Sequence, residues 1–392
     1  MASLYRSVVL LLSVATIQVQ ATEWDVEGIK GGYQQQQPEL QQTTLQADSP
    51  YVGPRLPRPT CMNEEESEPY LQTQENDEHR RFFEEEDMYF KSEYRSVKKL
   101  SESEFDDVHL AIKRSSGLKV VYKIIEKEDV KLYTLESTPP PKSHSIEVSA
   151  LYGKHVSARC MSPRPQSLLL PLEIETQKYL SQPGYENPSV PVVIDYIVTK
   201  DAYILAMEYP GEDWIELDEY LKRYDKLFVN EVRPLIKKVI KVSLSLKKFG
   251  IAHGCVTESN VLYNKDTGGV KLMNFGFSGP LEGCNQGSSA KAEYSVSASG
   301  SAGDSPDSGP TEIGDIKRIG YFLNHILTWG RTHQTPFNRN EGFVKGLKNK
   351  LDNPESQLAI NAVDLVAILL NYCSYKMSSI ENILDHPFFT SQ

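Results

Sequence analysis

The stretch that decides the fold reads HGCVTESNVLYNKDTGGVKLMNFG and runs from His253 to Gly276. The residues before it, Val229–Phe249, place apolar side chains at helical spacing, which predicts an amphipathic helix leading directly into the stretch. Asn260 and Asn274 offer neutral amide oxygens, which are weak ligands for Mg²⁺. Cys255 offers a thiol, which ionises readily only in an electropositive setting. Cys255, Asn260 and Asn274 are therefore polar positions without strong acid–base or metal-binding chemistry.

This layout resembles the catalytic loop and the metal-binding loop of protein kinases. In active kinases the two loops read H-R-D-L-x-x-x-N and D-F-G, where the first Asp accepts the substrate proton and the second holds Mg²⁺. Here Cys255 and Asn274 stand at the two Asp positions, and Thr257 stands at that of the catalytic-loop lysine. The resemblance therefore implies that none of the three is catalytic. Cys255 is expected to be a buried structural cysteine.

Other positions keep the residues that the family uses for structure. His253 and Phe275 match packing residues, and Gly276 completes the second loop. Asp315 begins a stretch that resembles the family's D-x-x-x-x-G helix, and it would hold the backbone of the catalytic loop. Gly254 replaces the arginine that would clamp an activation-loop phosphate, so activation by phosphorylation is not expected. The resemblance thus implies a retained fold around degenerate chemistry.

The resemblance begins near Tyr94 and extends to the C-terminus. The segment Leu100–Ala111 reads LSESEFDDVHLA, which keeps the apolar positions of the family's glycine-rich loop and none of its three glycines. Glycine allows backbone N–H groups to approach phosphates closely. Acidic residues here would face a triphosphate, a repulsion of several kcal/mol at an effective dielectric near 20. Tight binding of ATP in the usual pose is therefore not expected.

The resemblance also names the residues that would contact a nucleotide. Lys123 lies in a strand similar to the V-A-I-K segment, and Glu173 is its best-matched partner, with Glu175 as the rival. That ion pair is expected to dock a helix rather than to hold ATP. No metal or cofactor is expected, and Asn260 and Asn274 are only weak metal candidates. The nucleotide contacts, if any, would be Lys123, Glu173, Glu208 and Asn260.

Three segments are expected along the chain. Residues 1–21 combine Arg6, an apolar run and the sequence Val19-Gln20-Ala21, which predicts a signal peptide and hence the secretory pathway; the alternative is a buried N-terminal helix. Residues 22–90 are rich in Gln and Pro and then acidic, which predicts a disordered leader. Residues 91–392 are predicted to form an α+β, two-lobed kinase-like domain, with a β-rich N-lobe to about residue 208 and a helical C-lobe from 209.

Composition limits the partners. The 392 residues have a net charge of −11, which argues against a nucleic-acid surface and against a basic membrane patch. No later segment is apolar for long enough to span a bilayer. The five cysteines are scattered, so zinc binding is not expected, one or two disulfides remain open, and the odd count leaves a free thiol or an intermolecular bond. A protein partner is the expectation.

Three hypotheses of function follow. The first is a secreted pseudokinase that acts as a protein-binding regulator or scaffold, with an active kinase among the candidate partners. The second is an atypical ATP-dependent kinase or nucleotidyl transferase, which would bind ATP and Mg²⁺ through Lys123, Glu173 and Asn260. The third is a sequestering module recruited by its acidic leader. Secreted kinase-like effectors of parasites resemble this arrangement, including His-Gly in place of His-Arg, but only by analogy.

Overall fold

The computed structural model describes residues 55–100, 107–137, 164–165, 167–223, 227–281, 310–328, 346–370 and 379–391. All of them belong to one compact unit, Val52–Gln392. The predicted signal peptide, most of the glycine-loop counterpart and the Ser-rich segment after the second loop lie outside the described residues. Among the described residues, no helix is long and apolar enough to cross a membrane.

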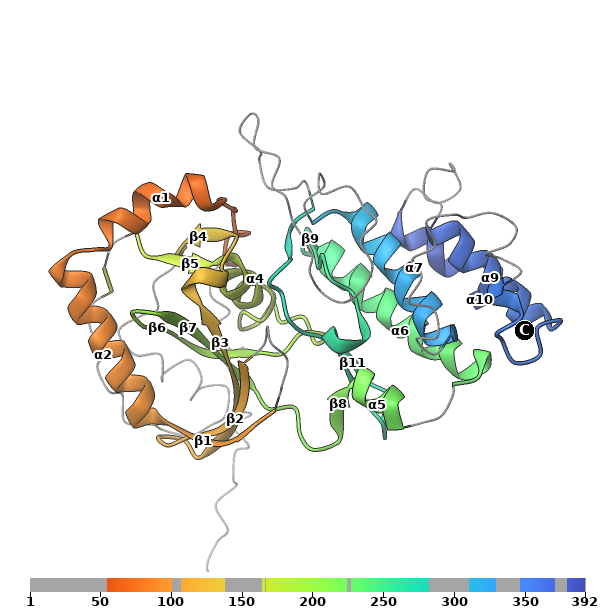
Figure 1. Cartoon of the computed structure of the whole chain (residues 1–392), viewed down its shortest axis with the longest axis horizontal. Coiled ribbons are helices and arrows are strands. Elements are labelled where there is room, and N and C mark those ends of the chain that lie inside the picture. The colour runs from red at the N-terminus through yellow and green to blue at the C-terminus, as the bar shows by residue number, and fades with distance from the viewer. Residues whose placement is uncertain are drawn as a thin grey trace, which may run out of the picture. The chain divides into compact units, whose positions relative to one another are not determined.

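A five-stranded antiparallel sheet dominates the first part of the unit, and a group of helices dominates the second, so the fold is α+β (Figure 1). A tight turn at Gly117, where φ is +69°, joins the second and third strands. Residues 190–198 and 202–209 are rich in β-branched and aromatic residues, which predicts two strands, and strands form at Val193–Val198 and Ala202–Glu208. In spatial order the strands are β1 (Tyr94–Lys99), β2 (Asp107–Lys113), β3 (Leu118–Glu126), β7 (Ala202–Glu208) and β6 (Val193–Val198).

An apolar cluster packs on each face of this sheet at β7. Successive side chains of the strand point to opposite faces and so enter different clusters. Tyr203 and Leu205 of β7 pack in one apolar cluster together with Ile174 of helix α4 (Leu172–Leu180). Ile204 and Ala206 pack in the cluster on the other face. Helix α4 thus lies on one face of the sheet, which brings its acidic residues toward β3.

The prediction of a disordered leader over residues 22–90 is wrong for its last part. Helix α1 (Glu64–Thr73) contacts the strand pair β4 (Tyr133–Leu135) and β5 (Leu169–Pro171), and helix α2 (Asp77–Glu93) contacts β6 and β1 of the five-stranded sheet (Figure 1). The average composition of this segment hides the helical spacing, in which Phe82 and Phe83 are buried while Glu84 and Glu85 face solvent. Asn63 caps α1, accepting from the N–H of Glu66 at 2.8 Å, and an asparagine likewise caps α2. Local capping and burial therefore outweigh the acidic composition.

A buried carboxylate fixes the end of α2 to the sheet. Asp195 of β6 accepts hydrogen bonds from the hydroxyls of Tyr89 at 2.7 Å and Tyr94 at 2.8 Å. Nζ of Lys113, on β2, lies 3.2 Å from the same carboxylate. A buried charge is tolerated when it is paired and hydrogen-bonded in this way. The two helices are therefore an integral part of the folded unit.

The residues just before α1 contact the region where α4 meets the helical part. The guanidinium of Arg55 lies over the rings of Tyr179 and Phe249, with centroid distances of 5.2 and 4.9 Å. The N–H of Leu56 donates to Oε1 of Gln182 at 2.6 Å. Cys61 is disulfide-bonded, and its partner is outside the described residues. This segment therefore links both parts of the unit.

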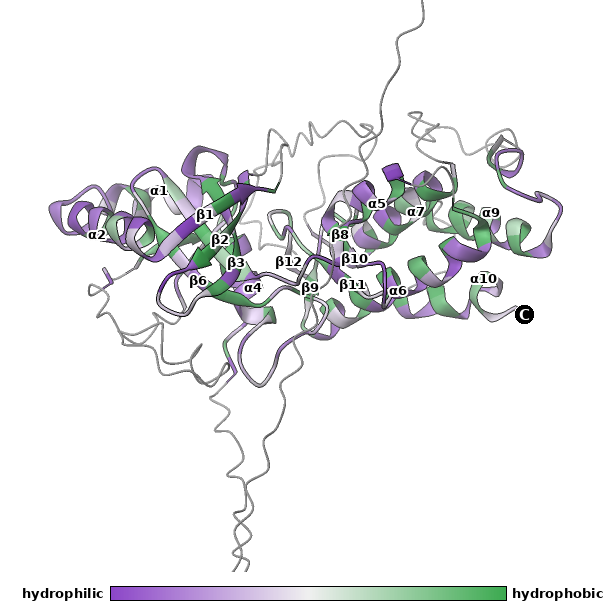
Figure 2. Ribbon diagram, turned by 90° about the horizontal axis from the view of Figure 1, so that it is seen from below, coloured by the Kyte–Doolittle hydropathy of each residue, from purple (hydrophilic) through white to green (hydrophobic). Residues whose placement is uncertain are grey.

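The helical part is built around α6 (Val229–Lys248), the amphipathic helix predicted before His253. Its buried face packs with α7 (Glu312–Thr328) and α9 (Gln357–Leu370), and hydrophobic residues recur along all three (Figure 2). A Cβ at Gly320 would lie 2.8 Å from Cβ of Leu369, so glycine allows α7 and α9 to approach closely. The last elements are 3₁₀ helix η3 (Ile380–Asp385) and α10 (Pro387–Thr390).

Short strands position the loops between these parts. Residues 213–224 have an apolar pattern that predicts a helix. They start instead with strand β8 (Trp214–Glu216), because its backbone pairs with β10, and become helix α5 only at Leu217–Arg223. The remaining short elements are η1 (Lys127–Asp129), β4 (Tyr133–Leu135), β5 (Leu169–Pro171), β9 (Ile251–Ala252), η2 (Glu258–Asn260), β10 (Val261–Asn264), β11 (Val270–Leu272) and β12 (Gly279–Pro280). Strand β10 pairs with β8 and β11, β9 with β12, and β4 with β5.

Candidate functional site

The candidate site centres on a buried ion pair between β3 and α4. Nζ of Lys123 lies 3.0 and 3.2 Å from the two carboxylate oxygens of Glu173, and both residues are buried. The rival Glu175 instead accepts from Ser137 at 3.0 Å and pairs with Lys178. The choice of Glu173 as the partner of Lys123 is confirmed.

Asn274 extends this pair into a chain of hydrogen bonds. Its Oδ1 accepts from Nζ of Lys123 at 2.8 Å, and its Nδ2 donates to Oδ1 of Asn260 at 3.2 Å. Asn260 in turn donates from Nδ2 to the carbonyl oxygen of Cys255 at 3.0 Å. The backbone of Asn274 has φ +63°, a left-handed conformation that asparagine tolerates better than most residues. Four polar groups thus satisfy one another across the site.

The same geometry makes these residues a poor fit for Mg²⁺ and nucleotide phosphates. Both amide oxygens already accept hydrogen bonds within the chain, and the carboxylate of Glu173 is paired with Lys123. Mg²⁺ in proteins is usually held by carboxylates together with substrate phosphates. Across the described residues, no group of three or more His, Cys, Asp or Glu side chains could hold a metal ion. The site residues therefore do not support chemistry that needs Mg²⁺ or a nucleotide.

Asp315 of α7 holds the backbone that leads into the site. Its two carboxylate oxygens accept from the N–H groups of His253 and Gly254, each at 2.8 Å. Burial raises the pKa of Asp315 to about 6, against the lowering effect of these two bonds. The role predicted for Asp315 is borne out by these contacts.

His253 has a packing role. The ring is fully buried, its Nε2 lies 3.1 Å from the carbonyl oxygen of Met273, and its centroid is 4.9 Å from that of Phe275. Burial lowers the pKa of His253 to about 4, so the ring is neutral at neutral pH. Gly276 follows, and a Cβ there would lie 3.4 Å from Oε2 of Glu173. These residues support the loops rather than supply an acid or base.

Comparison with known proteins agrees with this geometry. No model of a known protein family matches the chain. Over 185 residues the chain is 25% identical to the carbon catabolite-derepressing protein kinase of Saccharomyces cerevisiae, a match that covers 47% of this chain. The chain is similar to a protein kinase. It spans only 23% of the length of that relative.

Cys255 is the residue that the sequence resemblance matched to the base of protein kinases. The side chain is half-buried, and its thiol is free. Burial raises the pKa of Cys255, which keeps the thiol protonated at neutral pH. Thr257 lies further along the loop, with Oγ1 3.1 Å from Oγ of Ser259. Neither side chain has a partner that would make it a proton acceptor of the required strength.

Glu208 contacts a different group from the one expected. The residue ends β7, and its carboxylate forms an ion pair with Lys271 of β11. It is not joined to the hydrogen-bonded chain of Lys123, Asn274 and Asn260. Of the four predicted nucleotide contacts, Lys123, Glu173 and Asn260 lie together. Glu208 is paired with Lys271 instead.

The motifs gave no sign of two structural features around the site. Gly254 has φ +75°, and a Cβ on it would lie only 2.0 Å from the carbonyl oxygen of Phe277. Lys247 of α6 pairs with Glu312 at 2.8 Å and with Glu381 at 2.7 Å, which ties α6 to α7 and η3. A glycine and a lysine near a loop carry no signal of such contacts in a single sequence.

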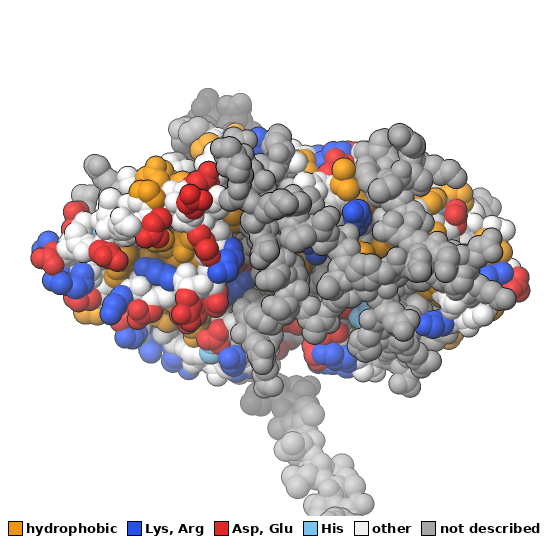
Figure 3. Space-filling model, turned by 45° about the horizontal axis from the view of Figure 1, so that its top comes forward, with side chains coloured by type: hydrophobic (Ala, Val, Ile, Leu, Met, Phe, Trp, Pro, Cys, Tyr) orange, Lys and Arg blue, Asp and Glu red, His pale blue; other side chains and the backbone are white. Residues whose placement is uncertain are grey.

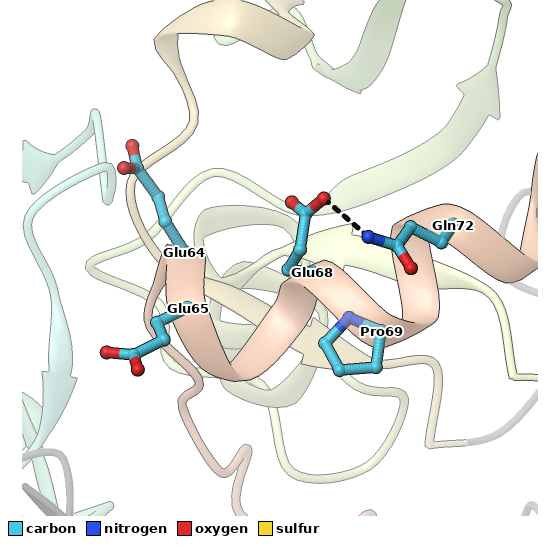
Figure 4. Close-up of a pocket in the computed structure, with 5 residues that line it drawn as sticks. All are labelled: Glu64, Glu65, Glu68, Pro69 and Gln72. Carbon is cyan, nitrogen blue, oxygen red and sulfur yellow. Dashed lines mark hydrogen bonds between the residues drawn. The ribbon is translucent and has the colours of Figure 1, made fainter.

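A shallow depression is lined by Glu64, Glu65, Glu68, Pro69 and Gln72, all from α1 (Figure 4). Within it Gln72 donates to Glu68 at 3.0 Å, and Glu64 pairs with Lys131 outside it. Acidic and basic side chains are interspersed on the visible described surface (Figure 3). An acidic depression on a single helix does not define a binding site.

Proposed function

We propose that the chain is a catalytically impaired, secreted pseudokinase that acts as a protein-binding regulator. In this proposal, residues 91–208 and 209–392 are the N-lobe and C-lobe of a two-lobed kinase-like fold. The observation that carries it is the chain of hydrogen bonds Glu173–Lys123–Asn274–Asn260, in which an amide replaces the metal-binding carboxylate and already has partners on both sides.

The base position supports the same conclusion. A kinase needs a group that accepts the proton of the substrate hydroxyl. Cys255 is protonated at neutral pH because burial raises its pKa, and His253, beside it, is fully buried. Without the base and the metal carboxylate, the chain lacks both the proton acceptor and the Mg²⁺ ligand that phosphoryl transfer uses. What remains is a rigid surface, which suits binding to another protein.

The secretory route has one further supporting observation. Cys61 is disulfide-bonded. Disulfides persist mainly in oxidising compartments such as the secretory pathway. Together with the signal-peptide-like residues 1–21, this favours a secreted protein or one held in the lumen of a vesicle.

An atypical enzyme is the second candidate, and one observation favours it. The pair of Lys123 and Glu173 is intact at 3.0 Å, as a nucleotide-binding kinase would require. Glu173 nevertheless also docks α4 onto the sheet, so the pair has a structural use without ATP. The two candidates differ in whether a nucleotide stabilises the folded chain.

Thermal unfolding of the purified secreted chain separates them. The midpoint is measured alone, with excess ATP and Mg²⁺, and with ATP in EDTA, beside a transfer assay with γ-labelled ATP. A ligand at about 100 times its Kd stabilises a protein by roughly 2.7 kcal/mol. We expect no shift and no transfer. A Mg²⁺-dependent shift that Lys123→Ala abolishes would favour the enzyme instead.

The binding role needs its own measurement. A protein captured with the chain is purified and titrated back by calorimetry, with and without ATP. We expect saturable binding that is unchanged by ATP and by the site variant Asn260→Ala. Failure of every captured protein to rebind in purified form would contradict a role in protein binding.

A further inference from the structure

A histidine and a glutamate join two elements that are far apart in the sequence. Nδ1 of His325, on α7, contacts Oε1 of Glu258, the first residue of η2. Nδ1 is shielded from solvent, although the side chain of His325 is 40% exposed and that of Glu258 is 19% exposed. The contact is therefore partly protected from screening by water and salt.

The position of Glu258 links this contact to the candidate site. Helix η2 ends at Asn260, whose Oδ1 accepts the hydrogen bond from Asn274. A single turn of 3₁₀ helix thus separates the ion pair from the hydrogen-bonded chain at the site. Glu258 and Asn260 therefore belong to the same short helix.

The surrounding charges favour a protonated ring. The hydrogen bond to Glu258 raises the pKa of His325 most, burial opposes it, and the charges of Glu258 and of Asp218 on α5 raise it further. Asp218 also pairs with Lys222 at 2.8 Å, which moderates its effect on the ring. In the described structure these are the charged groups that face His325 from neighbouring elements.

We propose that His325 is a proton-operated latch on the loop that carries Asn260. With a charged ring, Glu258 and α7 are held together. When the ring loses its proton, the carboxylate of Glu258 loses its counter-charge and the loop is released from α7. A raised pKa in the folded state contributes stability below the ordinary value of about 6.5, and that stability is lost as pH rises through the folded-state pKa.

The first test compares unfolding midpoints of the full chain from pH 5.5 to 8.5. We expect His325→Gln to lower the midpoint by about 1–2 °C at pH 5.5 and to have no effect at pH 8.5. His79→Gln is the control, because burial lowers the pKa of His79, which lies on α2. It should show no loss confined to low pH. An equal loss from His325→Gln at both pH values would overturn the latch.

The second test remains informative if His325→Gln fails to fold. In protein labelled with ¹³C at the histidine rings, the titration midpoint of His325 should fall in Glu258→Gln. The side-chain amide signals of Asn260 should shift with the same midpoint as His325 in the unmodified chain. An unchanged His325 midpoint in Glu258→Gln, or an Asn260 signal insensitive to this titration, would contradict the proposal.

Discussion

Nζ of Lys123 lies 2.8 Å from the amide oxygen of Asn274 and 3.0 Å from the carboxylate of Glu173. Because Lys123 donates to its oxygen, the amide nitrogen of Asn274 is left to donate to Asn260. Asparagine is thus a donor and an acceptor in one side chain. An aspartate in the same place would be an acceptor only at neutral pH.

Asn274→Asp should therefore destabilise the chain by about 1–3 kcal/mol, because two oxygens would then face each other where Asn274 now donates to Asn260. Chemical denaturation measures the loss. Asn353→Asp is the control, since Asn353 also has positive φ (44°) but is exposed. Equal effects of the two changes would show that the bond to Asn260 contributes nothing. We expect no gain of Mg²⁺-dependent ATP binding, because the glycine-loop counterpart lacks glycine.

Gly254→Ala should destabilise the chain by more than about 3 kcal/mol, because the new Cβ would lie 2.0 Å from a backbone oxygen of Phe277. Gly117→Ala provides the comparison. Gly117 has a similar φ of +69° but nothing within 4 Å of a Cβ, so only strain of about 1–2 kcal/mol applies. Denaturant midpoints of both variants separate steric contact from backbone strain. Equal losses would mean that the contact with Phe277 relaxes without penalty.

Glu86 should give the chain a pH-dependent stability. Burial raises the pKa of this carboxyl group to about 7, although Arg164 lowers it. A raised folded-state pKa means that the folded chain binds more protons between about pH 4.5 and 7. The unmodified chain should therefore gain about 1–3 kcal/mol relative to Glu86→Gln as pH falls through this window. Denaturation at pH 7.5 and pH 5 measures the difference, and Glu85→Gln, exposed on the same helix, should show none.

Arg55→Ala should destabilise the chain by about 0.5–1 kcal/mol, because its exposed guanidinium packs on the rings of Tyr179 and Phe249. Arg95→Ala is the control, since Arg95 is exposed on β1. Thermal unfolding of both variants tests whether the segment before α1 is part of the cooperative unit. Identical midpoints for the two variants would show that it is not.

The features predicted correctly from the sequence depend on local patterns. Helical spacing of apolar residues predicts α6. Enrichment in β-branched and aromatic residues predicts β6 and β7. The pairing of Lys123 with Glu173, and of Asp315 with the backbone at His253, followed from family resemblance. Each of these uses information that is carried within a short window or a motif.

The remaining features depend on contacts that no window contains. Composition averaged over residues 22–90 hid the buried face of α2, where Phe82 packs against a sheet formed by much later residues. Strand β8 replaced the start of the expected helix because Trp214 pairs with Asn264, some fifty residues on. Position 254 requires glycine because the backbone of Phe277 leaves no room for a Cβ, and this contact is seen only in the structure.

The pairing of β4 with β5 has a practical consequence. Leu135 and Leu169 are register partners, so the intervening chain leaves and returns at neighbouring points. Helix α4, with Glu173, begins directly after β5. Because the stem fixes both ends, extra residues between the strands should not displace α4. A fluorescent domain or an affinity tag inserted there would give an internal handle that reports on the chain and leaves both termini untouched.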